Sequence, residues 1–226
     1  MKKIAFFDLD KTVYNGASMQ RFLFGYLIPK RKIGFFNLLE ALLLVFRYGT
    51  RLISHNDASK KTIEISARVL NGKSITEVEK WQKDFFSVDE FYPHIPELFQ
   101  FLKSKGFTIY IVSASIQPIV KACADVLDVE CLASTVEIKN GVYTGTIEAL
   151  MNEHEKALAV ERKSSKDTEV SLGFGDSSGD LDMLKKVDHG FLFEPFEPAI
   201  IAQCTSFGIT VVNRNTILDQ VKKIIQ

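Results

Sequence analysis

Five short apolar runs, separated by segments with helical periodicity, are the feature that most constrains the fold of this chain. They span residues 3–7, 107–112, 170–174, 190–193 and 209–212. The runs are almost continuously apolar, as expected of strands that are buried on both faces of a parallel sheet. Helices are expected between them, over residues 95–105, 117–127, 155–162, 181–186 and 217–225. The sequence therefore predicts an α/β fold with a three-layer, Rossmann-like parallel sheet core.

Residues 14–91 interrupt this alternation, because they show helical periodicity and no convincing strand. Turn-forming residues divide the segment into four helices; they are Pro29, Gly49, Ser54 and the pair Asn71-Gly72. We therefore predict an all-helical domain, residues 14–91, inserted after the first strand of a core domain formed by residues 1–13 and 92–226.

A second interruption predicts a small β-hairpin that projects from the core. Residues 135–146 contain two alternating segments on either side of Asn140-Gly141. Asn-Gly is the strongest short signal for a two-residue hairpin turn, because both positions need positive φ.

Charge and apolar patterning favour a small-molecule substrate in the cytoplasm. The 28 Lys+Arg balance 28 Asp+Glu, which argues against a nucleic-acid partner. The start of the chain is not expected to be an export signal, because Asp8 and Asp10 interrupt its apolar run. The cysteines Cys123, Cys131 and Cys204 lack disulfide or zinc spacing, and free thiols are typical of a reducing compartment.

The apolar stretch of residues 35–46 is too short for a transmembrane segment, which needs about 20 apolar residues. Next to it, Lys30-Arg31-Lys32 has fewer than the roughly 4 to 8 basic residues of a lipid-binding cluster, so peripheral membrane contact is not expected. The apolar residues of the insert fit a leaving-group pocket or a helical core. We favour the core, because an amphipathic helix normally buries its apolar face.

Two acids follow the first predicted strand. Asp8 and Asp10 are two residues apart, so in extended geometry both side chains point the same way. Such a pair can divide nucleophilic and acid/base roles, although a capping or turn pair would look the same.

A second acidic cluster, Gly175-Asp176-Ser177-Ser178-Gly179-Asp180, follows the run 170–174 and should reach the same edge of the sheet. Converging carboxylates repel unless a cation lies among them, and hard oxygen ligands together with a phosphate favour Mg²⁺. Asp176 is the stronger candidate for a metal ligand, because Asp180 or Ser178 could instead cap the helix that begins near Leu181.

Ser113 and Lys156 are candidate anion-binding residues. Ser113 closes the run 107–112, and its hydroxyl with the following N–H groups is expected at a helix N-terminus, although a plain cap is the alternative. Lys156 is expected at the start of a helix, where a cation opposes the helix dipole unless an anion recruits it. A solvated surface lysine is the other interpretation, and Lys163 and Lys166 compete for the role.

Taken in order, four segments resemble the motifs of the haloacid-dehalogenase-like (HAD) phosphatases. They are Asp8-Leu9-Asp10-Lys11-Thr12, Val112-Ser113-Ala114-Ser115, Lys156 and the segment 175–180. The chain looks closest to the phosphoserine phosphatase-like branch, which has a helical cap between the first two motifs, as residues 14–91 would supply. The resemblance covers roughly the whole chain.

The resemblance implies Mg²⁺-dependent hydrolysis of a small phosphomonoester through an aspartyl-phosphate. Asp8 would be the nucleophile and Asp10 the general acid and then base. Mg²⁺ would be bound by the Asp8 side chain, the Asp10 backbone carbonyl and the Asp176 side chain. Asp180 would support these ligands without binding the metal itself. The phosphate-binding residues would be Thr12, Ser113, Ala114 and Lys156.

The chain departs from phosphoserine phosphatases at the positions that select the substrate. Residues 13–18 lack the glutamate that binds the substrate amine, and Ala114-Ser115-Ile116 stands in place of Gly-Gly-Phe. Lys11 occupies a position where many of these phosphatases have glycine, with no role assigned. A lipid-phosphate phosphatase, a phosphotransferase of the same superfamily and a non-catalytic binding module are the alternatives, and retention of every motif residue argues against the last.

Overall fold

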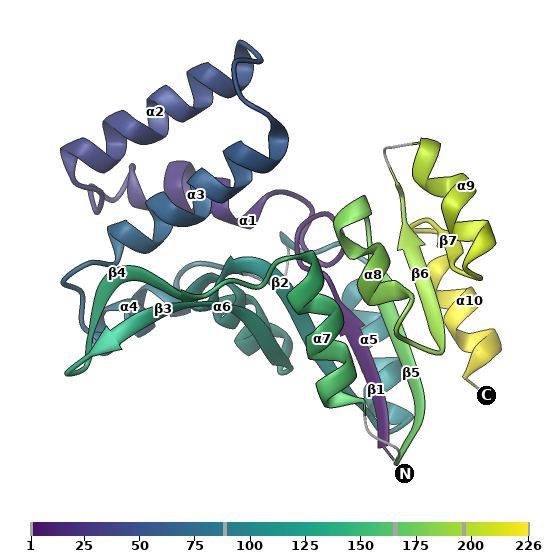
Figure 1. The fold of residues 1–226 in the computed structure, drawn as a ribbon. Helices are drawn as coiled ribbons and strands as arrows, with labels where there is room; N and C mark the ends of the chain where they lie inside the picture. Colours follow the sequence, from purple (N-terminus) through teal and green to yellow (C-terminus); the bar gives the residue numbers. More distant parts are fainter. Residues whose placement is uncertain (1, 88–89, 165–166, 196–197, 226) are drawn as a thin grey trace.

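The core is one seven-stranded sheet, as seen in a computed structural model that describes residues 2–87, 90–164, 167–195 and 198–225 (Figure 1). The strand order is β4-β3-β2-β1-β5-β6-β7, and every neighbouring pair is parallel except the antiparallel β3 and β4. The strands are β1 (Lys2–Phe7), β2 (Phe107–Ile116), β3 (Glu130–Lys139), β4 (Val142–Ala149), β5 (Thr168–Gly175), β6 (His189–Phe193) and β7 (Thr210–Val212). The predicted α/β fold is confirmed.

Helices cover both faces of this sheet (Figure 1). The side chains of the central strands pack alternately on the two helical layers. One layer contains α5 (Ile95–Ser104), α6 (Gln117–Leu127) and α10 (Ile217–Ile224), and the other contains α7 (Glu153–Lys163), α8 (Leu181–Leu184) and α9 (Pro198–Ser206). On β1, Ala5 and Phe7 face the first layer, whereas Ile4 and Phe6 face the second. Burial of both faces explains why the strands read as continuous apolar runs.

The central position of β1 determines where its carboxyl end lies. Phe7 is in register with Ile111 of β2 and Phe174 of β5, and the Phe7 and Phe174 rings stack with centroids 4.1 Å apart. The next amide, Asp8 N, donates to the Phe174 carbonyl at 2.8 Å. The residues that follow β1 and β5 therefore emerge side by side.

The predicted hairpin is present and is longer than its sequence signal. Asn140 and Gly141 join β3 to β4 with φ values of 51° and 75°, the positive values that the turn requires. The β3 residues that pair with β2 are Glu130–Ser134, whereas those that pair with β4 lie further along, between Thr135 and Lys139, so the hairpin projects beyond the parallel part of the sheet as expected.

The insert contains helices between the predicted breaks. They are α1 (Ser18–Gln20), which continues into the π-helical segment η1 (Arg21–Leu27), then α2 (Phe35–Gly49), α3 (His55–Val69) and α4 (Ile75–Lys83). Ser54 and Ser74 accept hydrogen bonds from backbone amides of the first turns of α3 and α4, which explains where these helices begin. Tyr14 and Phe91 form an isolated antiparallel bridge, so the chain leaves and re-enters the core at adjacent points.

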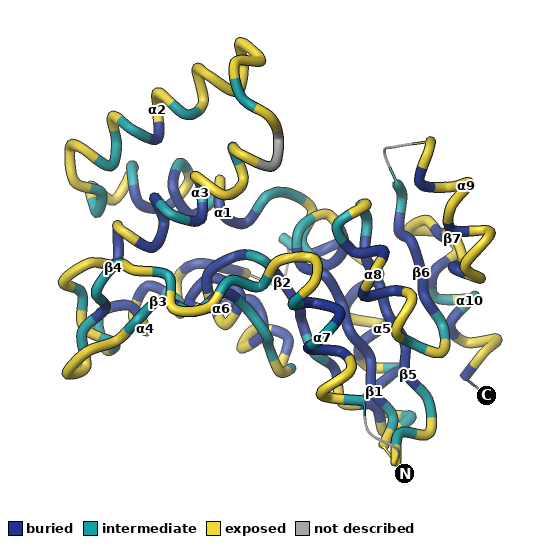
Figure 2. Tube along the Cα trace, viewed as in Figure 1, coloured by how far each residue is buried: buried dark blue, intermediate teal, exposed yellow. Residues whose placement is uncertain are grey.

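The expectation of a helical core in the insert is correct for η1 and wrong for α2. Phe22 and Tyr26 of η1 are buried, whereas Phe35, Phe36 and Phe46 of α2 are 73%, 83% and 63% exposed. Figure 2 shows α2 exposed over most of its length. Apolar periodicity predicts the helix, but it does not determine whether a neighbour covers the apolar face. Among the described residues, no helix is both long enough and apolar enough to span a bilayer.

Candidate active site

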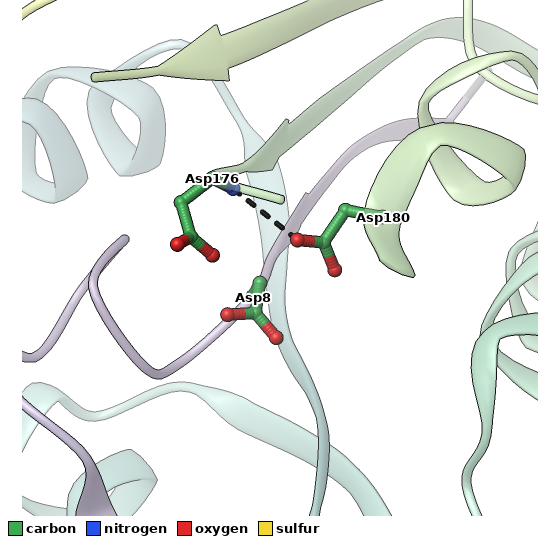
Figure 3. Close-up of side chains that lie close together, drawn as sticks. All are labelled: Asp8, Asp176 and Asp180. Atoms are coloured by element: carbon green, nitrogen blue, oxygen red, sulfur yellow. Dashed lines mark hydrogen bonds between the residues drawn. The ribbon is translucent and has the colours of Figure 1, made fainter. Parts of the chain in front are cut away.

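Three carboxylates meet at the carboxyl ends of β1 and β5 (Figure 3). Asp8 directly follows β1, Asp176 directly follows β5, and Asp180 ends the short 3₁₀ helix η3 (Ser178–Asp180). Each offers an oxygen atom within 4.8 Å of the others. The structure thus brings together Asp8 and Asp176, which the sequence analysis placed at the same edge of the sheet.

Lys156 is the buried cation of this cluster. Its Nζ donates to Asp8 Oδ1 at 2.6 Å and to Asp180 Oδ1 at 2.7 Å, and the lysine is 7% exposed. Lys156 lies in the first turn of α7, where Asn152 caps the helix. A buried ion pair has a large desolvation cost, so this lysine is held here by its two carboxylates.

Asp180 has two structural roles, as a cap and as a partner of Lys156. Its Oδ2 accepts hydrogen bonds from Asp176 N and Ser177 N, each at 3.2 Å, and from Ser177 Oγ at 3.0 Å. Both Asp180 oxygens are therefore engaged, and the carboxylate fixes the Asp176 backbone relative to Lys156. A Cβ on Gly175 would lie 2.4 Å from Asp180 Cβ, so only glycine allows this close approach.

Asp10 lies beside the insert and outside the three-carboxylate cluster. Its Oδ1 accepts a hydrogen bond from Ser18 N at 2.8 Å, at the start of α1. The Ser18 hydroxyl in turn lies 2.9 Å from the Ser115 hydroxyl. Asp10 is thus connected through the first residue of the insert helix to the end of β2.

Ser113 is buried, but its predicted position at a helix N-terminus is wrong. Strand β2 continues to Ile116, and α6 begins only at Gln117, where Pro118 favours a helix start. Ser113 instead lies at an irregularity in the β2–β3 register, and its Oγ accepts from Ser115 N at 3.2 Å. The strand continues past Ser113 because the apolar side chains of Val112 and Ile116 on either side are buried.

Ser134 is a residue of this region that the sequence analysis missed. Its hydroxyl donates to the Ala114 carbonyl at 2.7 Å and accepts from Met151 N at 3.0 Å. Ser134 therefore links the end of β2 to the segment that leads into α7 and Lys156. A lone serine inside a strand gives no sequence signal for such a bridge.

The other two residues of the first motif differ in burial. Thr12 is 2% exposed, and its hydroxyl has no hydrogen-bond partner among the described residues. An unpaired buried hydroxyl is costly, so a ligand oxygen or water is the expected partner. Lys11 is exposed with a φ of 60°, and its charge lowers the pKa values of Asp10 and Asp176 against the effect of their burial.

Burial and mutual repulsion raise the carboxylate pKa values. Burial raises the pKa of Asp8 well above its ordinary value, and the Lys156 ammonium only partly opposes this. Burial also raises the pKa of Asp10, and with the charge of Asp180 it raises the pKa of Asp176 to about 7. Burial alone would lower the pKa of Lys156, but the charges of Asp180 and Asp8 raise it above its ordinary value. The buried ammonium of Lys156 therefore neutralises only part of the negative charge of these carboxylates.

The uncompensated carboxylate oxygens fit a hard divalent cation. Asp180 has both oxygens engaged, whereas no described residue donates a hydrogen bond to the Asp176 carboxylate or to the second oxygen of Asp8. Carboxylate oxygens are the ligands that Mg²⁺ prefers. Asp8 and Asp176 are therefore the side chains best placed to bind a metal.

A cavity lies apart from these residues, between α3 and β4. Its volume is about 590 Å³, and its lining mixes charged residues with apolar ones: Lys60, Ile63, Glu64, Arg68, Thr144, Gly145, Thr146, Ile147 and Leu150. None of these is a predicted catalytic or phosphate-binding residue. The chemistry is therefore assigned from the carboxylate cluster and not from cavity size.

A family profile of haloacid dehalogenase-like hydrolases matches residues 5–185, which include all of the candidate site residues described above. The chain belongs to this family. No curated protein sequence matches the chain significantly.

Solved structures of low sequence identity share the fold. A Bordetella pertussis Tohama I protein of unknown function is 20% identical over 95% of this chain and 99% of its own, with a TM-score of 0.77. A phospho-aspartyl intermediate analogue of phosphoserine phosphatase is 20% identical over 100% of this chain and 99% of its own, with a TM-score of 0.65. Cytosolic 5′-nucleotidase IIIB bound to cytidine is 16% identical over 98% of this chain and 86% of its own, with a TM-score of 0.68. These neighbours share the fold of the chain, and the family match shows that the chain belongs to a hydrolase family.

Proposed function

We propose that the protein is a Mg²⁺-dependent phosphomonoester hydrolase that acts through an aspartyl-phosphate on Asp8. The observation that carries the proposal is the Lys156 ammonium between Asp8 and Asp180, with Asp176 in the same cluster. An anionic carboxylate can approach a phosphoryl group only when negative charge is neutralised. Lys156 and a metal at Asp8 and Asp176 would supply that positive charge.

In the proposed reaction the two acids of the first motif have separate roles. An Asp8 oxygen attacks phosphorus, the ester oxygen leaves, and Asp10 gives that oxygen its proton. Asp10 then removes a proton from the water that hydrolyses the aspartyl-phosphate, which regenerates Asp8. The raised pKa of Asp10 favours the protonated form needed for the first step.

The phosphate oxygens would be bound by Lys156, the Ser113 hydroxyl, the Ala114 backbone amide and Thr12. The unpaired buried hydroxyl of Thr12 supports its place in this set. Mg²⁺ would be bound by the Asp8 side chain, the Asp10 backbone carbonyl and the Asp176 side chain, and it would neutralise charge on the phosphoryl group. Asp180 would support this arrangement by positioning Lys156 and the Asp176 backbone.

We further propose that residues 14–91 are a cap domain on a core formed by residues 1–13 and 92–226. The bridge between Tyr14 and Phe91 supports this division, because it pairs the two chain crossings at the domain boundary. The hydrogen bond from Ser18 N to Asp10 ties the first cap helix to the proposed acid/base residue. Movement of the cap would therefore change the position of the Asp10 carboxylate.

Hydrolysis of p-nitrophenyl phosphate tests the proposal. Turnover should require Mg²⁺ and stop on chelation, and Asp8→Asn should abolish turnover while leaving the circular dichroism spectrum unchanged. Beryllofluoride with Mg²⁺ should stabilise the wild-type protein against heat and should not stabilise Asp8→Asn. Turnover with excess chelator would refute the metal requirement, and near-native turnover of Asp8→Asn would refute the covalent step.

A further inference from the structure

Helix α2 has its apolar face directed away from the rest of the molecule. Five of its exposed apolar residues recur at helical spacing: Phe35, Leu39, Leu42, Leu43 and Phe46. Their exposed fractions range from 46% to 73%. A surface helix of a globular protein ordinarily has the opposite orientation, with its apolar stripe toward the core. An uncovered stripe of this extent marks an interaction site.

The inner face of α2 packs on α3. Ala41 is its buried residue, Leu44 packs against the core, and Glu40 pairs with Arg68 of α3 at 2.7 Å. Glu40 is the only acid of α2, and this ion pair directs it away from the apolar face. The outer face is therefore apolar with no negative charge.

Basic residues lie at both ends of this face. Arg31 precedes the helix, and Arg47 and Arg51 lie at its carboxyl end; all three are exposed and have no ion-pair partner within the described residues. Lys30 and Lys32 of the same segment are engaged with the protein, because Lys30 pairs with Asp84 at 4.0 Å and Lys32 lies over the Trp81 ring. The sequence analysis counted Lys30-Arg31-Lys32 and did not include Arg47 and Arg51, which are distant in the chain. Each basic residue near an anionic bilayer surface contributes about 1 kcal/mol to binding, so the three unpaired arginines favour such a surface.

We propose that α2 binds the surface of an anionic lipid bilayer, with its apolar face in the interface and its terminal arginines on lipid headgroups. Phenylalanine and leucine on one face with basic residues alongside is the composition of interfacial helices. A second copy of the chain fits less well. Antiparallel pairing of two α2 helices would bring Arg31 of one copy toward Arg47 of the other, and parallel pairing would align identical arginines, with no free acid to compensate.

Flotation with vesicles tests this surface independently of catalysis. The wild-type chain should float with phosphatidylcholine vesicles that contain phosphatidylglycerol, less with phosphatidylcholine alone, and less again at high salt. The face variant Phe35→Ser/Leu39→Ser/Phe46→Ser and the charge variant Arg31→Gln/Arg47→Gln/Arg51→Gln should each lower the partition coefficient at least about tenfold. Because the altered residues are exposed, both variants should keep the wild-type melting temperature.

A control variant distinguishes binding by this surface from nonspecific binding through other exposed apolar residues. Val126→Ser/Ile138→Ser/Phe207→Ser removes exposed apolar residues elsewhere and should float like the wild type. Absence of wild-type flotation, or flotation unchanged in the face variant, would overturn the proposal, and equal binding to both vesicle types would overturn the choice of an anionic surface. A wild-type dimer that the face variant converts to a monomer, without vesicle binding, would assign α2 to self-association instead.

Discussion

Lys156 Nζ and Asp8 Oδ1 are 2.6 Å apart, although 148 residues separate them in the chain. The contact is buried and is shared with Asp180, so a single cation holds the proposed nucleophile and its neighbour in place. In the proposed function, the cation that holds these two carboxylates would also contact the phosphoryl group of the substrate.

Replacement of Lys156 tests this double role. Lys156→Met should lower kcat for p-nitrophenyl phosphate by about 10²–10³ because it removes charge stabilisation of the transition state. The free energy of unfolding should fall by about 3–5 kcal/mol, since Asp8 and Asp180 lose a buried partner. Kinetics and urea unfolding measure the two effects. The exposed Lys163 of the same helix is the control, and an active Lys156→Met paired with an inactive Lys163→Met would reverse the assignment.

Replacement of Asp176 tests the metal site. Asp176→Asn should raise the Mg²⁺ concentration for half-maximal activity by at least about tenfold, because a neutral amide is a weaker ligand than a carboxylate. Titration of activity with Mg²⁺ and calorimetry of Mg²⁺ binding give two readouts. The exposed Asp182→Asn, which removes a nearby charge without touching the cluster, should leave both unchanged. Equal Mg²⁺ affinity in Asp176→Asn and wild type would exclude Asp176 as a ligand.

A methyl group at Gly175 should disturb Asp180 without changing any charge. Its Cβ would lie 2.4 Å from Asp180 Cβ, so Gly175→Ala must displace Asp180 or the β5 end. We expect a loss of about 1–3 kcal/mol in the free energy of unfolding, as for other overpacked sites, together with a reduced kcat. Gly49→Ala, where the added Cβ meets no atom within 4 Å, is the matched control. Wild-type stability and kcat in Gly175→Ala would contradict the packing argument.

His94 should make stability depend on pH. Burial lowers its pKa, and neither ring nitrogen has a hydrogen-bond partner among the described residues. As pH falls below about 6.5, the unfolded state binds a proton that the folded state resists, so the contribution of His94 to the unfolding free energy should fall and then level off below the lowered pKa. The active-site carboxylates with raised pKa values give a pH dependence of the opposite sign, so the His94 effect is measured as a difference between variant and wild type. In His94→Phe, which suits the contacts with Tyr92 and Phe193, the melting temperature should rise relative to the wild type as pH falls from 8 to 5. The exposed His154→Gln should show no such pH-dependent difference, and a pH-independent difference in His94→Phe would assign the effect to other groups.

The convergence of Asp8 and Asp176 was predictable because strand ends in a parallel sheet share one edge. That geometry follows from the order of strands and helices alone, without any knowledge of side-chain packing. The role of Asp180 was only half predictable. Its sequence position allowed either a helix cap or a supporting residue, and the structure shows that one carboxylate does both through different oxygens.

Features that depend on long-range packing were not predictable. The helix α9 has only Ile200 and Cys204 buried, one turn apart, which is too weak a pattern to predict from sequence. The outward orientation of α2 was missed because the same apolar spacing serves a core or a surface. Ser113 was placed at a helix start because local serine preference was visible, while the continuation of β2 depends on burial against distant residues.

Of the seven strands described, the one that is translated first lies in the middle of the sheet. Both neighbours of β1 come much later, from Phe107 and Thr168 onward. This apolar strand is therefore without a partner until β2 has been made, and β5 can join it only after the residues from Thr168 onward have emerged. Nascent chains that stall before α7 would carry Asp8 without Lys156, and they would depend on chaperones to keep β1 from pairing with other exposed strands.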